Sequence, residues 1–96
     1  MDKVPVVYIL ASKPRGTTYI GVTSNLQHRV WQHKQGLVEG FTNQHHVHQL
    51  VYFEVCPTMH AAIEREKQLK NWRRSWKVQL VEVNNNRWDD LYLDLF

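Results

Sequence analysis

The chain carries the stretch VVYILASKPRGTTYIGV at residues 6–22, and this stretch decides the fold. Residues 6–11 and 17–22 are both rich in β-branched and aromatic side chains, a composition typical of β-strands. The loop between them contains Pro14 and Gly16, which supply the fixed φ and the positive φ that a tight connection requires. The stretch therefore predicts a β-hairpin with strands at residues 6–11 and 17–22.

A helix is predicted directly after the hairpin. Ser24 and Gln27 have the spacing of an N-terminal capping box, so the helix should begin at Asn25. It should end near Gln35, because Gly36 is a natural residue to follow a helix. No periodic pattern is visible from there to about His48, which predicts a loop.

A third strand is predicted at residues 49–55, where the alternation places Leu50, Tyr52 and Glu54 on one face. Thr58 then caps a second helix that runs to Lys70, and the helical pattern continues or restarts over residues 72–81. The order β-β-α-β-α-(α) predicts an α/β (α+β) fold, with a small, three-stranded, mainly antiparallel sheet flanked by helices.

Length and composition favour one domain spanning residues 1–96, since 96 residues with 43% hydrophobic and 22% charged side chains suit one small core. Cys56 is the only cysteine, which excludes a disulfide within the chain and favours a reducing, cytoplasmic setting. The longest apolar run, residues 6–11, is too short to cross a membrane. The first residues lack the pattern of a secretory signal.

Positive charge is concentrated in one part of the chain. The 12 Lys and Arg residues exceed the 9 Asp and Glu residues by only 3. Half of the basic residues lie within residues 65–77, namely Arg65, Lys67, Lys70, Arg73, Arg74 and Lys77. Such a cluster is typical either of phosphate contacts with a nucleic acid or of a solvated helix face.

Two positions in the first helix depart from an ordinary amphipathic pattern. With 100° per residue, Arg29 lies about 60° and His33 about 20° from the direction of Leu26, so both side chains point toward the core or its margin. Either they belong to a functional site, or Arg29 extends its charged end to water and His33 forms a hydrogen bond at the rim.

Glu66 is the corresponding anomaly in the second helix. It lies in the middle of the apolar stripe formed by Ala62, Ile63 and Leu69. An ionised carboxylate is rarely buried without a partner or a metal ion. The alternatives are a metal site and an ion pair, either with Lys70 one turn later or with an arginine of the first helix.

Two further groups have a simpler interpretation. His45, His46 and His48 lie close together, but they lack a second pair of ligands with the spacing of a structural zinc site, so a polar loop is favoured. Trp72 and Trp76 are one helical turn apart, and we expect them to be core and helix-packing residues rather than platforms that stack on nucleobases.

Several spaced motifs occur together in one order. They are Val7-Tyr8-Ile9, Tyr19-Ile20-Gly21, Leu26-x-x-Arg29-x-x-x-His33, Phe41-Thr42 and Glu66-x-x-x-Lys70. This arrangement resembles the GIY-YIG nuclease superfamily, in particular its small stand-alone bacterial members, over about residues 6–92. Two positions depart from the pattern: Val7 replaces the first glycine, and Val22 stands where the nuclease domain of the excinuclease has lysine.

The resemblance implies a metal-dependent endonuclease that hydrolyses DNA phosphodiester bonds. Glu66 would hold a single Mg²⁺ or Mn²⁺ ion, and Arg29 would neutralise charge on the phosphate. Tyr8, Tyr19 or His33 would act on the attacking water, and we expect these residues to converge if both helices pack on the face that the tyrosines share. The basic residues of the second helix and the segment after it would contact the nucleic acid.

The implied substrates are branched, flapped or single-stranded DNA, recognised by shape or through a protein partner, as in DNA repair. Two alternatives remain open. The chain is either a catalytically inactive nucleic-acid-binding domain of the same fold, or an interaction module that uses its acidic, aromatic segment from Trp88 to Phe96.

Overall fold

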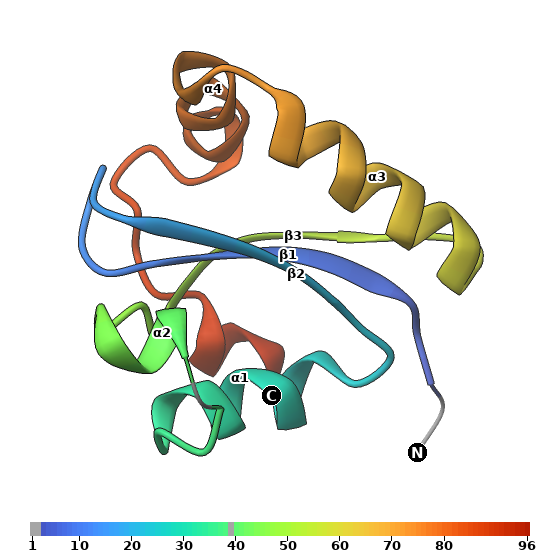
Figure 1. Ribbon diagram of the computed structural model, residues 1–96, viewed down its shortest axis with the longest axis horizontal. Coiled ribbons are helices and arrows are strands. Elements are labelled where there is room, and N and C mark those ends of the chain that lie inside the picture. The colour runs from blue at the N-terminus through green and yellow to red at the C-terminus, as the bar shows by residue number, and fades with distance from the viewer. Residues whose placement is uncertain (1–2, 39) are drawn as a thin grey trace.

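A three-stranded sheet lies between two layers of helices in the computed structural model, which describes residues 3–38 and 40–96 (Figure 1). The strands are β1 (Val6–Ala11), β2 (Thr18–Thr23) and β3 (Gln49–Val55), in the antiparallel order β2-β1-β3. One face is covered by α1 (Leu26–Lys34), α2 (Phe41–Gln44) and the 3-10 helix η1 (Tyr92–Leu95), and the other by α3 (Met59–Asn71) and α4 (Arg74–Asn84). This architecture confirms the predicted fold class and element order.

The hairpin is present as predicted: β1 has the predicted bounds, and β2 begins and ends one residue later than the predicted 17–22. Its turn differs from the expectation, because the residue with positive φ is Arg15 (φ 55°) and not Gly16. Gly16 is required for a different reason: a Cβ atom there would lie 2.5 Å from Oγ of Ser12 and 2.7 Å from Cγ of Lys13. The glycine therefore permits a close approach within the turn.

The start of α1 corrects the predicted capping box. The N-cap is Asn25, whose side chain accepts a hydrogen bond from the backbone N–H of His28 at 3.2 Å. The Gln27 side chain does not complete a capping box, because its amide donates to the carbonyl oxygen of Leu95 in η1. Gly36 has a φ of 72° and ends the helix as predicted.

The segment predicted as a loop contains the short helix α2, which the sequence pattern did not indicate. Its residue Thr42 is buried, and the Thr42 carbonyl accepts a hydrogen bond from the N–H of Val47 at 2.9 Å. A helix of four residues has too few apolar positions to show a period, so only its tertiary contacts reveal it.

A β-bulge in β3 corrects the predicted alternation of that strand. The register between β1 and β3 shifts between Ile9 and Leu10, so Tyr52 is opposite Ile9 and Leu50 is opposite Leu10. Leu50 consequently packs on the α1 side, whereas Tyr52 packs on the α3 side. The prediction that these two residues share a face was wrong, because the bulge adds a residue between them.

The second half of the chain follows the prediction more closely. Thr58 caps α3 by accepting a hydrogen bond from the N–H of Ala61 at 3.0 Å, and the helical pattern restarts at Arg74 as α4. Asn85 ends α4 and is buried, and its side-chain amide donates to the carbonyls of Val51 and Asp89 at 3.0 and 2.9 Å. These bonds attach the C-terminal segment to β3.

Two hydrophobic clusters form the core, one on each face of the sheet. Val7, Ile9 and Val51 pack with α3 and α4, whereas Tyr8, Leu10 and Leu50 pack with α1. Both faces of β1 are thus buried. Among the described residues, no helix has the length and apolar character needed to span a membrane.

Candidate active site

Tyr8 and Tyr19 lie on the face of the sheet that α1 covers. Tyr8 is paired with Gly21 and Tyr19 with Leu10, so the tyrosines are diagonal neighbours, and their ring centroids are 6.5 Å apart. The Tyr8 ring crosses the backbone of Gly21, where a Cβ atom would lie 2.5 Å from Cζ of Tyr8. Glycine at position 21 therefore makes room for the Tyr8 phenol.

His33 in the last turn of α1 completes an aromatic triangle with the tyrosines. Its ring centroid lies 6.0 Å from that of Tyr8 and 5.6 Å from that of Tyr19. Nε2 of His33 is 3.2 Å from the hydroxyl oxygen of Tyr8, and both residues are only 1% exposed. The structure thus brings together the three candidates for the general base.

Thr42 is a member of this site to which the sequence assigned no role. Its Oγ1 atom lies 3.1 Å from Nδ1 of His33, so both ring nitrogens of the buried imidazole have hydrogen-bond partners. The signal that could have revealed it was the Phe41-Thr42 pair within the family-like motifs. The pair lies in a region without periodicity, and its function therefore went unassigned.

Burial keeps the Tyr8–His33 pair electrically neutral at pH 7. It is the main cause that lowers the pKa of His33 to about 4, with smaller effects in the same direction from the charges of Arg29 and His48. Burial also raises the pKa of Tyr8 to about 12, an effect that the Arg29 side chain opposes and that the charge of Glu66 strengthens. At neutral pH the phenol keeps its proton and the imidazole is uncharged.

Two arrangements of hydrogens satisfy both bonds of His33. In one, the Tyr8 hydroxyl donates to Nε2, and the N–H at Nδ1 donates to Thr42. In the other, the N–H at Nε2 donates to Tyr8, and the Thr42 hydroxyl donates to Nδ1.

Arg29 supplies positive charge beside the tyrosine. It is half-buried on α1, and its Nη1 atom donates to Oε1 of Gln32 at 3.3 Å. Within the described part of the chain it forms no ion pair with a carboxylate. The guanidinium group therefore keeps most of its capacity to bind an anion.

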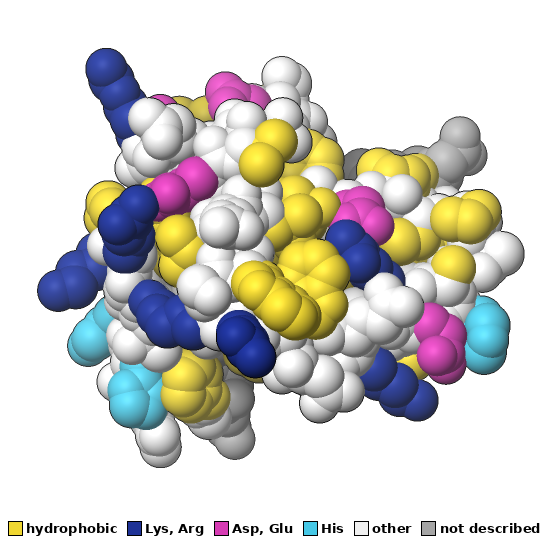
Figure 2. All heavy atoms as spheres, turned by 90° about the horizontal axis from the view of Figure 1, so that it is seen from above, with side chains coloured by type: hydrophobic (Ala, Val, Ile, Leu, Met, Phe, Trp, Pro, Cys, Tyr) yellow, Lys and Arg dark blue, Asp and Glu magenta, His cyan; other side chains and the backbone are white. Residues whose placement is uncertain are grey.

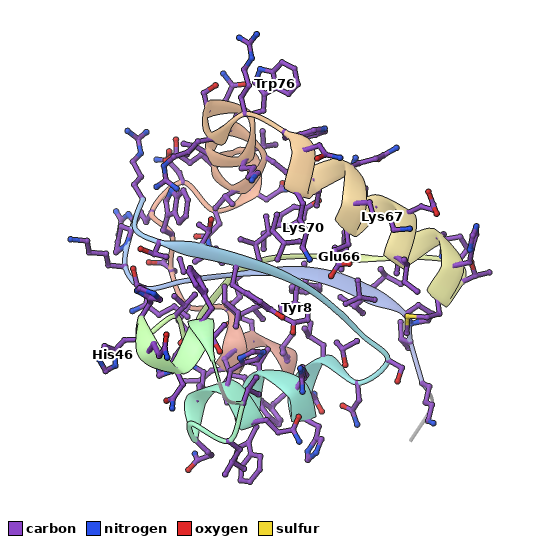
Figure 3. The ribbon with its side chains drawn as sticks, in the orientation of Figure 1. Tyr8, His46, Glu66, Lys67, Lys70 and Trp76 are labelled. Atoms are coloured by element: carbon purple, nitrogen blue, oxygen red, sulfur yellow. The ribbon has the colours of Figure 1, made fainter. Side chains whose placement is uncertain are left out.

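Glu66 approaches the site from the opposite layer, which corrects the expectation that both helices pack on one face. Helix α3 packs over β1 and the edge strand β2, and Figure 3 shows Glu66 between α3 and the sheet, with Tyr8 on the other side. Even so, the negative charge of Glu66 is among the influences that raise the pKa of Tyr8. This effect is the smallest of those that act on the pKa of Tyr8, after burial, Arg29 and Tyr19.

The Glu66 side chain is 21% exposed, and one oxygen lies 3.5 Å from Nζ of Lys70. The ion-pair alternative is therefore realised, yet water still reaches the carboxylate. No group of three or more His, Cys, Asp or Glu side chains able to hold a metal ion is found among residues 3–38 and 40–96. An ion at Glu66 would need water and phosphate oxygens as its other ligands, a set that Mg²⁺ and Mn²⁺ accept.

The six basic residues of the 65–77 segment fall into different environments. Arg65 is paired with Glu54 at 3.2 Å, and Arg74 donates to the carbonyls of Arg15 and Gly16 at 2.6 and 2.9 Å. These two arginines hold elements of the fold together. The structure places Lys70 beside Glu66, whereas Lys67, Arg73 and Lys77 form no ion pair with any described residue.

The histidine-rich loop has the features of the polar loop that the sequence favours. His45 packs against Phe41 with ring centroids 4.6 Å apart, and His46 points away from the molecule (Figure 3). His46 and His48 meet edge to face at 6.2 Å. His46 therefore points away from the constellation around Tyr8, whereas the charge of His48 still acts on His33.

Known proteins are similar to this chain in sequence and in fold. The family model for the GIY-YIG catalytic domain matches residues 4–79. A UPF0213 protein of Haloquadratum walsbyi is 34% identical over 82 residues, which cover 85% of this chain and 91% of that protein. A UPF0213 protein of Pediococcus pentosaceus is 37% identical over 68 residues, or 71% of this chain and 72% of that protein.

A solved structure extends the likeness to three dimensions. The solution NMR structure of a UPF0213 protein from Bacillus halodurans matches with a TM-score of 0.56 and 26% sequence identity, covering 91% of this chain and 92% of that one.

Proposed function

This chain belongs to the GIY-YIG catalytic domain family, which implies an endonuclease-type function, and from that premise we propose that it is a divalent-metal-dependent endonuclease that hydrolyses DNA phosphodiester bonds. One observation carries the proposal: the buried Tyr8–His33 hydrogen bond lies where both Arg29 and Glu66 influence the phenol. A neutral proton-accepting pair, a guanidinium group without a carboxylate partner and a carboxylate are groups that can support metal-assisted hydrolysis of a phosphodiester.

Glu66 is the proposed metal ligand, and Mg²⁺ or Mn²⁺ fits its single, water-accessible carboxylate. When bound, such an ion would supply Lewis-acid stabilisation of negative charge on the phosphate. In the free protein Lys70 forms an ion pair with one oxygen of the Glu66 carboxylate. We infer that the lysine moves away from this oxygen when the metal ion binds, and that it then contacts the substrate.

Arg29 is the proposed phosphate-binding residue. Its planar guanidinium group can donate two hydrogen bonds to the non-bridging oxygens of one phosphate. An incoming phosphate would also offset the positive charge that now lowers the pKa of His33. Substrate binding would thus weaken one of the smaller causes of the low pKa of His33, while burial, the main cause, remains.

Tyr8 and His33 are proposed to remove the proton from the attacking water together. Tyr8 is buried in the free chain, so the incoming substrate must admit the water to its hydroxyl. The Tyr8 oxygen then accepts a proton from water while its own proton passes to Nε2 of His33, which becomes an imidazolium, so a free tyrosinate never forms. This transfer requires the arrangement in which Nδ1 of His33 donates to Thr42. Tyr19 is half-buried beside the pair, and we assign its hydroxyl to orienting the water or the phosphate.

A cleavage panel tests the proposal. The purified chain is incubated with branched, flapped, single-stranded and duplex DNA in Mg²⁺, in Mn²⁺ and in EDTA. We expect cleavage of at least one substrate, only with metal, and its loss in Glu66→Ala and Arg29→Ala. Cleavage that survives both substitutions would contradict the proposal. Salt-sensitive binding without cleavage in any metal would instead support the inactive nucleic-acid-binding alternative.

A further inference from the structure

The face formed by α3 and α4 carries a groove that the proposed catalytic residues do not line. Its volume is about 450 Å³, and its walls are Trp72, Trp76, Gln79, Leu80 and Val83. Figure 2 shows hydrophobic side chains in the middle of this face, with Lys and Arg side chains and some Asp and Glu side chains around them. The groove thus combines an apolar floor with a basic border.

Two tryptophans dominate the groove. Their rings meet nearly at a right angle, with centroids 6.0 Å apart. Trp72 packs partly against the core, as predicted, whereas Trp76 meets the Trp72 ring but is 48% exposed and belongs to neither core cluster. A large aromatic ring held at the surface at this exposure is available to stack on a ligand.

Arginines accompany both rings. The Arg65 guanidinium lies 5.1 Å from the Trp72 ring centroid, and that of Arg73 lies 5.5 Å from the Trp76 centroid. Arg73 has no carboxylate partner in the described part of the chain. No acidic residue occurs in residues 67–81, and Glu82 beyond them is paired with Arg15. The charge around the groove therefore suits a polyanion.

We propose that this groove binds unpaired bases of a single-stranded nucleic acid, with Trp76 as the stacking platform and Arg73 and Lys77 on the neighbouring phosphates. Aromatic rings beside unpaired basic side chains are the combination by which proteins hold single strands without reading their sequence. A duplex presents no free base faces to Trp76, so its binding would rest on the phosphate contacts alone.

The inference rests on the proposed nuclease function, because it makes the groove a second contact for the same substrate. Glu66 lies on α3, and Trp72, one wall of the groove, is the residue that ends this helix. From Glu66 to the last helical residue, Asn71, α3 rises by about 8 Å, which is on the order of a few nucleotides of a strand. The preferred substrate would then contain an unpaired segment next to the bond that is cut.

Equilibrium binding in EDTA tests the groove separately from catalysis. Fluorescence anisotropy is measured with labelled single-stranded DNA, single-stranded RNA and blunt duplex DNA of one sequence. We expect at least one single strand to bind about tenfold more tightly than the duplex. Trp76→Ala should remove about tenfold of that affinity, and Trp76→Phe should retain most of it. The matched control is Trp31→Ala, since Trp31 is 42% exposed on α1 and should be neutral.

Equal affinity for single strands and duplex, or wild-type binding by Trp76→Ala, would overturn the inference. Sedimentation velocity tests whether a second copy of the chain binds in the groove instead. If Trp76→Ala abolishes self-association and leaves the binding of single strands unchanged, the groove is an interface between copies of the chain. If cleavage depends on Glu66 but the binding of single strands does not depend on Trp76, the inference about the groove is refuted and the proposed nuclease function is not. Trp76-dependent binding without cleavage of any DNA would refute the nuclease alone.

Discussion

The hydroxyl oxygen of Tyr8 lies 3.2 Å from Nε2 of His33, in a position where neither residue has appreciable contact with solvent. The bond joins the central strand β1 to the last turn of α1, and Thr42 of α2 extends it to a third element. Because burial lowers the pKa of the imidazole and raises that of the phenol, the pair stays neutral over a wide range of pH. We therefore expect the free energy of unfolding and the rate of cleavage both to change when the pair becomes charged.

Acid should destabilise the fold through His33. The pKa of His33 is about 4 in the folded chain and 6.5 in the reference state, so between these values the unfolded chain binds a proton that the folded chain does not. The stabilisation from a neutral His33 is therefore complete above about pH 6.5 and is lost as the pH falls toward 4, by about 3 kcal/mol. Urea unfolding across this pH range measures the free energy of unfolding of the wild type and of His33→Gln. This free energy should change less with pH in the variant than in the wild type. Equal slopes would contradict the account.

Loss of the Thr42 hydroxyl should disturb the tautomer of His33. Thr42→Val keeps the shape of the side chain but leaves Nδ1 of His33 without a partner, at a cost of about 1–3 kcal/mol in the free energy of unfolding. Thr42→Ser restores the hydroxyl and should recover most of the loss. The ¹⁵N shifts of the imidazole should report a hydrogen on Nδ1 in the wild type and a mixture in Thr42→Val. A hydrogen found on Nε2 in the wild type would exclude the proposed proton transfer.

Gly21→Ala should displace the Tyr8 ring, since the new methyl group would lie 2.5 Å from its Cζ atom. Overpacking of this kind costs about 1–3 kcal/mol, and we expect cleavage to fall at least about tenfold as the bond to His33 lengthens. A double-mutant cycle with Tyr8→Ala isolates the cause by urea unfolding. The loss in the free energy of unfolding caused by Gly21→Ala should largely disappear in the Tyr8→Ala background. An equal penalty in both backgrounds would show that strain in β2, and not the phenol, is responsible.

Lys70 should compete with the metal ion for Glu66. Its Nζ atom is 3.5 Å from the carboxylate, so Lys70→Met removes a positive charge beside the proposed site. The Mn²⁺ concentration that gives half-maximal cleavage should fall in this variant. Lys67→Met is the matched control, because Lys67 is exposed on the same helix and forms no ion pair with a described residue. A rise in the required Mn²⁺ with Lys70→Met would contradict the competition.

Local signals in the sequence predicted most elements of the fold. Strands β1 and β3 have the predicted bounds, and Thr58 caps α3 as expected, because these features depend on neighbouring residues alone. The position of Glu66 in an apolar stripe also identified it as unusual without any knowledge of the sheet. Local chemistry was sufficient in each of these cases.

Features that depend on distant contacts were missed. A helical stripe shows which side of a helix is apolar, but not which face of the sheet it covers, and so α1 and α3 were placed on one face. The bulge between Ile9 and Leu10 depends on the pairing of β1 with β3. Thr42 is buried by its contact with His33 and by the hydrogen bond from Val47, neither of which leaves a periodic pattern.

The central claim is that the carboxylate of Glu66 makes this chain a metal-dependent nuclease. Single-turnover cleavage at saturating Mn²⁺ tests it most directly, with Glu66→Gln compared with Glu64→Gln, an exposed glutamate on the same helix. Loss of a metal ion that contributes several kcal/mol should slow Glu66→Gln by about a hundredfold or more, while Glu64→Gln cleaves at the wild-type rate. Equal cleavage by Glu66→Gln and the wild type would contradict the claim.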